Sequence, residues 1–187
     1  MRVLLVATNR EQSPFPVSPV GVLAVAAATL AAGHEVDLVD LMFARAPLRR
    51  VRSALGARHY DVVALGIRNL DNCFWAGPRH FFEDVRAVVE AVRGSTRAPI
   101  VLGGSGFSVE PQGWLSRLDV DYGVVGEGEA AFVALLDALA AGRSADGIVG
   151  VTSRSDIARR QHASGRRKPP IPTSFVPDIT ALAPPAH

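Results

Sequence analysis

The sequence is poor in residues that bind metals or form covalent cross-links. Its 187 residues include a single cysteine, Cys73. One thiol excludes a disulfide scaffold, a zinc ribbon and any iron–sulfur cluster held by three or four thiolates of this chain alone. The five histidines are scattered and lack ligand partners at helical spacing. Nothing near Cys73 in the sequence supplies a base to activate it. We therefore expect no metal ligands and no catalytic residues among the side chains.

Long apolar runs are also missing. No stretch approaches the ~20 uninterrupted apolar residues that a membrane span requires. The segment Met1–Ala7 has one charged side chain, a short apolar run and no cleavage-type ending, which is typical of a buried strand rather than a signal peptide. We therefore expect no membrane partner and a cytoplasmic location.

Excess charge is small, and it is unevenly distributed. The net charge is +2, with 14 basic and 16 acidic side chains in residues 1–150 against 6 basic and 2 acidic ones in residues 151–187. The basic segment could contact nucleic acid, but it has no interleaved aromatic residues and proline follows at once. A solvated linker is the favoured interpretation, so no nucleic-acid partner is expected.

Apolar residues are abundant and regularly patterned. They make up 48% of the chain, enough for one domain that buries roughly two-thirds of its unfolded surface. Short β-branched runs alternate with longer alanine-rich amphipathic stretches. This predicts an α/β fold with a doubly wound, Rossmann-like or flavodoxin-like parallel sheet of five or six strands and flanking helices. The predicted strands are 2–7, 35–40, 61–67, 99–103, 122–125 and, more weakly, 147–151; the predicted helices are 19–32, 48–58, 78–93, 111–118 and 127–141.

The alternating pattern stops near residue 151. Residues 153–168 are polar and basic, and proline is frequent in 168–172 and 183–186. We therefore divide the chain into a Rossmann-like domain at 1–151 and a basic, proline-rich linker or tail at 152–187.

In a doubly wound sheet, ligands bind beyond the carboxyl ends of the strands, so the loops after the strands are the candidate site. Loop 8–19 is too long for a simple connection and holds three prolines. It lacks a Gly-x-Gly-x-x-Gly motif and a phosphate-loop lysine, which argues against nicotinamide, flavin or nucleotide-hydrolysing functions. Residues 68–75 combine amides and aromatic rings, which suits a flat ligand. For Phe74 and Trp75 themselves, a place in the core is favoured, with Asp71 or Asn72 forming a turn.

Glycines and glutamates follow the fourth and fifth predicted strands. Three glycines within 103–106 remove Cβ atoms where a ligand or backbone approaches, although a tight turn would account for one or two of them. Residues 126–129 open a helix, and their glutamates either favour the helix dipole or contact a ligand. In both cases the carboxylates would repel a phosphate.

Five segments, taken in order, resemble the amino-terminal cobalamin-binding domain of cobalamin-dependent radical S-adenosylmethionine (radical SAM) enzymes. They are 2–6, 18–21, 66–72, 99–107 and 125–132, and the resemblance extends over essentially the whole chain. It implies that the nucleotide tail of cobalamin is detached from cobalt and buried beside the fourth strand, where the glycines make room. The cofactor-binding residues implied are Thr8, Ser18, Pro19, Gly21, Arg68, Asn69, Leu70, Asp71, Asn72, Gly103, Gly104, Ser105, Gly106, Phe107, Gly126, Glu127 and Gly128.

One departure from the wider cobalamin-binding group concerns the cobalt ligand. Methionine synthases and mutases carry Asp-x-His-x-x-Gly, whose histidine ligates cobalt, whereas this sequence has Ser18 at that position when aligned on Gly21. The resemblance thus implies base-off cobalamin without a histidine ligand, with residues 68–70 under the corrin limiting access to the lower axial position. Weakly ligated cobalt suits methyl transfer to a substrate radical, with S-adenosylmethionine remethylating cob(I)alamin and cob(III)alamin delivering the methyl group.

The catalytic half of the resembled enzymes needs a Cys-x-x-x-Cys-x-x-Cys motif, which a chain with one cysteine cannot supply. The iron–sulfur cluster and S-adenosylmethionine would therefore come with a separate or missing radical SAM domain or subunit, and residues 177–185 resemble the linker that precedes it. We expect a corrinoid carrier that is not catalytic alone. Two alternatives remain: a ligand-free interaction or regulatory domain of the same fold, and a flavodoxin-like domain that binds a nucleotide or flavin.

Overall fold

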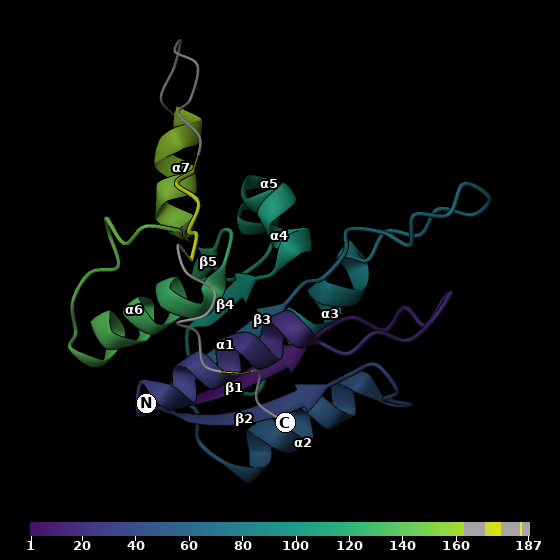
Figure 1. The fold of residues 1–187 in the computed structure, drawn as a ribbon, viewed down its shortest axis with the longest axis horizontal. Helices are drawn as coiled ribbons and strands as arrows, with labels where there is room; N and C mark the ends of the chain where they lie inside the picture. Colours follow the sequence, from purple (N-terminus) through teal and green to yellow (C-terminus); the bar gives the residue numbers. More distant parts are fainter. Residues whose placement is uncertain (163–170, 177–183, 185–187) are drawn as a thin grey trace.

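The computed structural model describes residues 1–162, 171–176 and 184. Within them, helices flank a six-stranded sheet on both sides (Figure 1). The strands are β1 (Arg2–Ala7), β2 (Glu35–Asp40), β3 (Val62–Gly66), β4 (Ile100–Gly103), β5 (Tyr122–Val124) and β6 (Val151–Ser153). The helices are α1 (Val20–Ala31), α2 (Pro47–Ala57), α3 (Phe82–Arg93), α4 (Ser105–Val109), α5 (Pro111–Arg117), α6 (Gly128–Ala140) and α7 (Arg154–His162).

The sheet has the order β2-β1-β3-β4-β5-β6. Strands β1 to β5 are parallel, and β6 is antiparallel to β5. Because β2 and β3 lie on opposite sides of β1, the strand order reverses there. Such a reversal opens a crevice beyond the carboxyl ends of the central strands, where ligands bind in folds of this type. The predicted fold class is confirmed.

Two apolar cores cover the two faces of the sheet. Helices α1 and α6 pack against each other over one face, and their core contains small residues such as Ala26 and Ala64. Helices α2, α3, α5 and α7 cover the other face, where Phe107 and Trp114 are buried. The bulkier side chains thus fill the second face, whereas the first leaves room between helices and sheet.

The sixth strand differs from the sequence prediction in place and direction. It was expected at 147–151 as part of a parallel sheet, but Gly147 and Gly150 adopt φ values of 82° and 83°, which an extended strand does not. The chain turns through these glycines and returns antiparallel to β5. The expected boundary at residue 151 therefore falls inside β6, and α7 follows directly, with Ile157 fully buried in the core.

The segment after β3 also differs from its prediction. Helix α3 begins at Phe82 rather than near Pro78. Residues 68–81 instead form a loop that projects beyond the strand ends (Figure 1) and is closed by an antiparallel bridge between Asp71 and His80. A short helix, α4, was not predicted.

Part of the predicted tail lies against the domain. The N–H of Ser174 donates to the carbonyl of Val125 at 3.0 Å, and the N–H of Glu127 donates to the carbonyl of Ser174 at 3.0 Å. The Glu127 carboxylate accepts from the N–H of Val176. Ser174 therefore forms an isolated parallel bridge with Gly126, just beyond the end of β5. Most of the proline-rich tail and of the linker-like residues 177–185 lies outside the described residues.

In the described ranges, no helix has the length and apolar character needed to cross a bilayer. The same ranges contain no group of three or more histidine, cysteine, aspartate or glutamate side chains arranged to hold a metal ion.

Candidate functional site

A cavity of about 530 Å³ opens at the carboxyl ends of the parallel strands, on the face covered by α1 and α6. Side chains alternate along a strand, so alternate residues near the carboxyl ends of β1, β3, β4 and β5 face this cavity. Its floor contains Leu5, Ala7, Ala64, Val101 and Val124, and its walls contain Val22, Val25 and Phe132. The interior is thus an apolar slot between sheet and helices, of a size typical for small-molecule sites.

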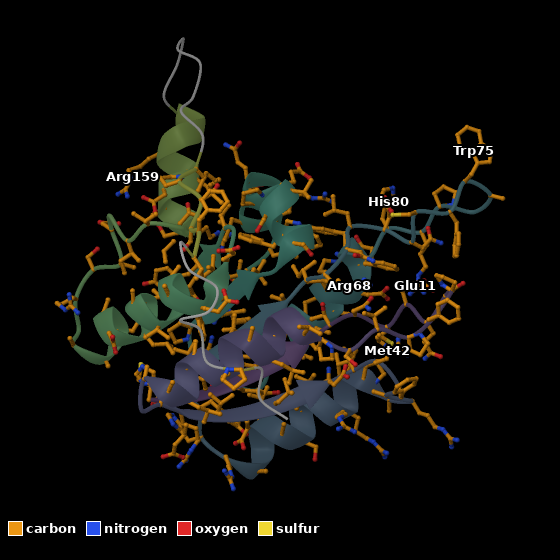
Figure 2. All side chains as sticks on the ribbon, in the orientation of Figure 1. Glu11, Met42, Arg68, Trp75, His80 and Arg159 are labelled. Atoms are coloured by element: carbon orange, nitrogen blue, oxygen red, sulfur yellow. The ribbon has the colours of Figure 1, made fainter. Side chains whose placement is uncertain are left out.

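Polar and charged side chains gather at the mouth of the slot. Asn9 and Asp40 lie at the ends of β1 and β2, and Glu127 and Glu129 lie at the start of α6. Arg68 is the one basic residue among the described residues that line the cavity. It lies with Glu11 and Met42 at the strand-end edge (Figure 2).

Arg68 is anchored through its backbone while its side chain is free. The Ser105 hydroxyl donates to the Arg68 carbonyl at 2.7 Å, which ties the β3 loop to α4. The guanidinium is exposed and has no hydrogen-bond or ion-pair partner among the described residues. It is therefore available to a ligand at the mouth of the slot.

The three glycines after β4 serve different purposes. A Cβ on Gly103 would meet Val124 only at 3.8 Å, an ordinary contact, so this glycine leaves volume to the cavity. A Cβ on Gly104 would lie 2.5 Å from the Ile67 carbonyl oxygen, and Gly104 has φ 97°. A Cβ on Gly106 would lie 2.9 Å from the backbone of Asn69. The second and third glycines therefore allow close backbone packing between two loops.

Of the residues predicted to bind a cofactor, ten line the cavity. They are Ser18, Pro19, Gly21, Arg68, Gly103, Gly104, Ser105, Gly126, Glu127 and Gly128. The other seven, Thr8, Asn69, Leu70, Asp71, Asn72, Gly106 and Phe107, do not line it.

Four of the seven residues outside the cavity support the loops around it. The buried Thr8 hydroxyl donates to the Gly66 carbonyl at 2.9 Å and so ties β1 to β3. Asn69 borders a small second pocket between the β1 and β3 loops. Leu70 packs against the core, and Phe107 is fully buried in it.

The projecting loop 68–81 is held by its own turn contacts. Asp71 accepts from the N–H of Cys73 at 2.8 Å, and Asn72 accepts from the N–H of Arg79 at 3.0 Å. These contacts confirm the turn interpretation. The core interpretation of the aromatic residues is wrong, because Trp75 is 98% exposed at the loop tip (Figure 2) and Phe74 is exposed beside it.

Cys73 lies in the same loop and is exposed. Its hydrogen bond to the Asp71 carboxylate raises the pKa of the Cys73 thiol, since a carboxylate favours the protonated form. The thiolate, which is the nucleophilic form, is thereby disfavoured. A nucleophilic role for this cysteine has no structural support.

Several cavity residues were missed by the sequence analysis. Asp40 is the last residue of β2, Met42 follows that strand, and Asn9 follows β1. The rule that directed attention to the ends of the other strands applies equally to β2, and it would have found Asp40. The apolar wall residues carry no such signal, because valines in an alanine-rich helix look the same whether they face a core or a ligand.

Comparison with known proteins identifies the class of ligand. A family model described as the B12 binding domain matches residues 7–136. Tryptophan 2-C-methyltransferase from Streptomyces laurentii is 36% identical over 141 residues, which cover 75% of this chain and 24% of that protein. The chain belongs to the B12-binding domain family, in the form found in cobalamin-dependent radical SAM enzymes. The family predicted from the sequence is confirmed, and cobalamin is the ligand that it implies.

Solved structures agree with this assignment. The radical S-adenosylmethionine methyltransferase TsrM from Kitasatospora setae, solved with cobalamin and a [4Fe-4S] cluster bound, matches with a TM-score of 0.75 and 31% identity. A second structure of TsrM, with tryptophan substrate and a SAM analogue, matches with a TM-score of 0.75 and 32% identity. Each match covers 80% of this chain and 28% of that one. The cobalamin-dependent radical enzyme OxsB, at 18% identity and a TM-score of 0.63, shares the fold. The chain thus spans about a quarter of the length of TsrM and of the methyltransferase relative.

The residues present fit a corrinoid. The slot is apolar and open at Gly103, as a planar aromatic base requires. The mouth is polar, and the Asn9 side-chain nitrogen is buried without a hydrogen-bond acceptor in the protein. A buried donor of this kind costs about 1–3 kcal/mol, and a corrin with peripheral amides offers acceptors to satisfy it.

Proposed function

We propose that the chain binds cobalamin base-off and without a histidine ligand, as the corrinoid-carrying part of a radical SAM methyltransferase-type system. The observation that supports this most directly is the composition of the cavity. It combines a deep apolar slot with a mouth that has no histidine among the described lining residues. Ser18 lines the mouth, and in the sequence aligned on Gly21 it replaces the cobalt-ligating histidine of the wider cobalamin-binding group.

Different parts of the cavity would hold different parts of the cofactor. The slot beside Gly103 and Gly128 would hold the nucleotide tail and exclude water from it. The strand ends would support the corrin, with Arg68 beneath it. Cobalamin, when bound, supplies a carrier for a methyl group between S-adenosylmethionine and a substrate. None of the cavity residues is assigned a proton transfer or a bond-breaking step.

The proposal is tested with the purified chain and hydroxocobalamin. We expect the corrinoid to remain bound through gel filtration and to show a base-off absorption spectrum. After reduction to cob(II)alamin, we expect an electron paramagnetic resonance signal without nitrogen hyperfine splitting. Free cobalamin at the same neutral pH is the control, because its own base remains on cobalt. Loss of the corrinoid on the column, or nitrogen splitting in the bound form, would contradict the proposal.

A second experiment concerns the lower face of the corrin. Because the Arg68 guanidinium is unpaired at the cavity mouth, we propose that it limits access to the lower axial position. Arg68→Ala is expected to admit water, which changes the cob(II)alamin resonance from a four-coordinate to a five-coordinate signal. Arg79→Ala is the matched control, since Arg79 pairs with Asp84 at 2.6 Å and does not line this cavity. Identical signals from the wild type and Arg68→Ala would refute this role.

The partner that we propose is a radical SAM domain or subunit, in the same polypeptide or another. Three exposed aromatic residues from three strand-end loops support this. Phe15, Phe43 and Trp75 are 74%, 70% and 98% exposed, and they follow β1, β2 and β3. Exposed aromatic rings grouped at one edge are typical of a binding surface, and this edge carries the cavity mouth. A partner seated there would face the corrin.

A further inference from the structure

A hydrogen-bond donor and an acceptor stand on neighbouring strand ends at one side of the cavity. Ala7 pairs with Asp40 in the parallel β1–β2 ladder, so the side chains of both point to the same face of the sheet. Asn9 lies two residues beyond Ala7 in the loop after β1, where it borders this cavity and also the small second pocket. Both Asn9 and Asp40 line the cavity. Neither was among the residues expected to bind a cofactor.

The orientation of the Asn9 amide is set by its own loop. The Asn9 side-chain oxygen accepts from the N–H of Glu11 at 3.3 Å. Exchanging the oxygen and nitrogen would place two donors against each other, so Nδ2 is the free end of the amide. This nitrogen is buried and has no acceptor in the described protein. A ligand acceptor in the cavity would satisfy it.

Asp40 is the complementary case, because one oxygen of its carboxylate has no hydrogen-bond donor among the described residues. Its Oδ1 accepts from the N–H of Met42 at 2.9 Å. The described residues provide no donor to Oδ2 and no ion-pair partner for the carboxylate. Two contacts hold the neighbouring loops in place, because Arg10 donates to the Ala44 carbonyl at 3.3 Å and Gln12 donates to the Met42 carbonyl at 3.1 Å. The Asn9 donor and the Asp40 acceptor therefore lie in one wall of the cavity, where hydrogen bonds join the loops after β1 and β2.

We propose that Asn9 and Asp40 form a carboxamide subsite that selects corrinoids by the chemistry of one peripheral side chain. The inference rests on the proposed cobalamin binding. A primary amide offers a carbonyl oxygen to Asn9 and an NH₂ group to Asp40. A carboxylate at the same place would turn an oxygen towards the Asp40 carboxylate, which is repulsive and leaves Asp40 without a donor. The wall thus favours a fully amidated corrinoid over one that carries a free acid here.

The test compares cobalamin with the isomers in which one propionamide has been hydrolysed to a carboxylate. Affinities are measured by equilibrium dialysis with absorbance detection. We expect the wild-type chain to bind one isomer about tenfold or more weakly than cobalamin, the cost of exchanging a charge-assisted hydrogen bond for like charges. Asp40→Asn keeps the acceptor for the Met42 N–H and adds a donor. It should therefore lower the ratio of the affinity for cobalamin to the affinity for this isomer severalfold. Asn9→Asp replaces the donor by a second carboxylate and should widen it.

Glu90→Gln is the matched control, because it removes one negative charge from α3 on the opposite face of the sheet. It should leave the ratio unchanged. If the wild type binds no cobalamin, the proposed function fails. If it binds cobalamin and every isomer equally, the proposed function stands and the carboxamide subsite is refuted. Equal changes in the affinities for all isomers with Asp40→Asn would also refute it, because they would indicate a general charge effect.

Discussion

Replacing Gly103 by leucine is expected to lower the affinity for cobalamin by ~100-fold or more while the chain remains folded. The backbone tolerates the change, since a Cβ at this position makes only ordinary contacts with Val124. The rest of the leucine side chain would extend into the slot that we assign to the nucleotide tail. A ligand that depends on a preformed cavity cannot enter once that cavity is filled.

The effect is measured by corrinoid retention on gel filtration and by the rise in Tm on adding hydroxocobalamin. Wild-type protein should gain stability with ligand concentration, and Gly103→Leu should not. Gly56→Leu is the matched control, because Gly56 lies on α2 with open space around it. Retention of cobalamin by Gly103→Leu at wild-type affinity would show that the tail binds elsewhere.

Replacing the next residue, Gly104, by alanine is expected to lower the free energy of unfolding by about 3 kcal/mol or more. Two physical effects add. The φ of 97° is strained for any L side chain, and the new Cβ would lie 2.5 Å from the Ile67 carbonyl oxygen. The same carbonyl accepts from the N–H of Gly106 at 2.9 Å, and the N–H of Ile67 donates to Gly103 at 2.8 Å. The loop therefore cannot move away without losing hydrogen bonds.

Urea denaturation followed by circular dichroism measures this loss of stability. Gly103→Ala is the control, and we expect its stability to stay within about 1 kcal/mol of the wild type. If Gly104→Ala proves as stable as Gly103→Ala, the close approach of the β3 and β4 loops is not as tight as the structure indicates. With the expected outcome, Gly103→Leu reports a binding defect and Gly104→Ala reports a folding defect at adjacent positions.

Gly103 and Gly104 also show which part of the site the sequence could predict. Three glycines in 103–106 indicated a close approach, but the pattern left open whether a ligand or the backbone approaches. The choice depends on what lies opposite each Cβ. Gly103 faces open cavity, whereas Gly104 and Gly106 face the backbone of the β3 loop. That neighbour is more than thirty residues away in the chain, so no local pattern reveals it.

The aromatic residues of the β3 loop illustrate a similar limit. A tryptophan close to a buried strand is usually a core residue, so for Trp75 the core interpretation was favoured over contact with a ligand. The turn formed by Asp71, Asn72 and Arg79 carries it away from the sheet. In α7, Ile157 is the only fully buried side chain of the described part of the helix, so its amphipathic pattern is too weak to predict a packed helix.

Secondary structure and family could be derived from local information, because a period of about two or 3.6 residues and the short motifs at strand ends are properties of neighbouring residues. The strands β1 to β5 and five of the helices were predicted from the sequence within a few residues of their observed ends. The direction of β6, the exposure of Trp75 and the placement of Asn9 and Asp40 at one cavity depend on contacts between distant segments. Burial and side-chain surroundings are properties of the packed chain, and these determine which strand-end residues line the cavity.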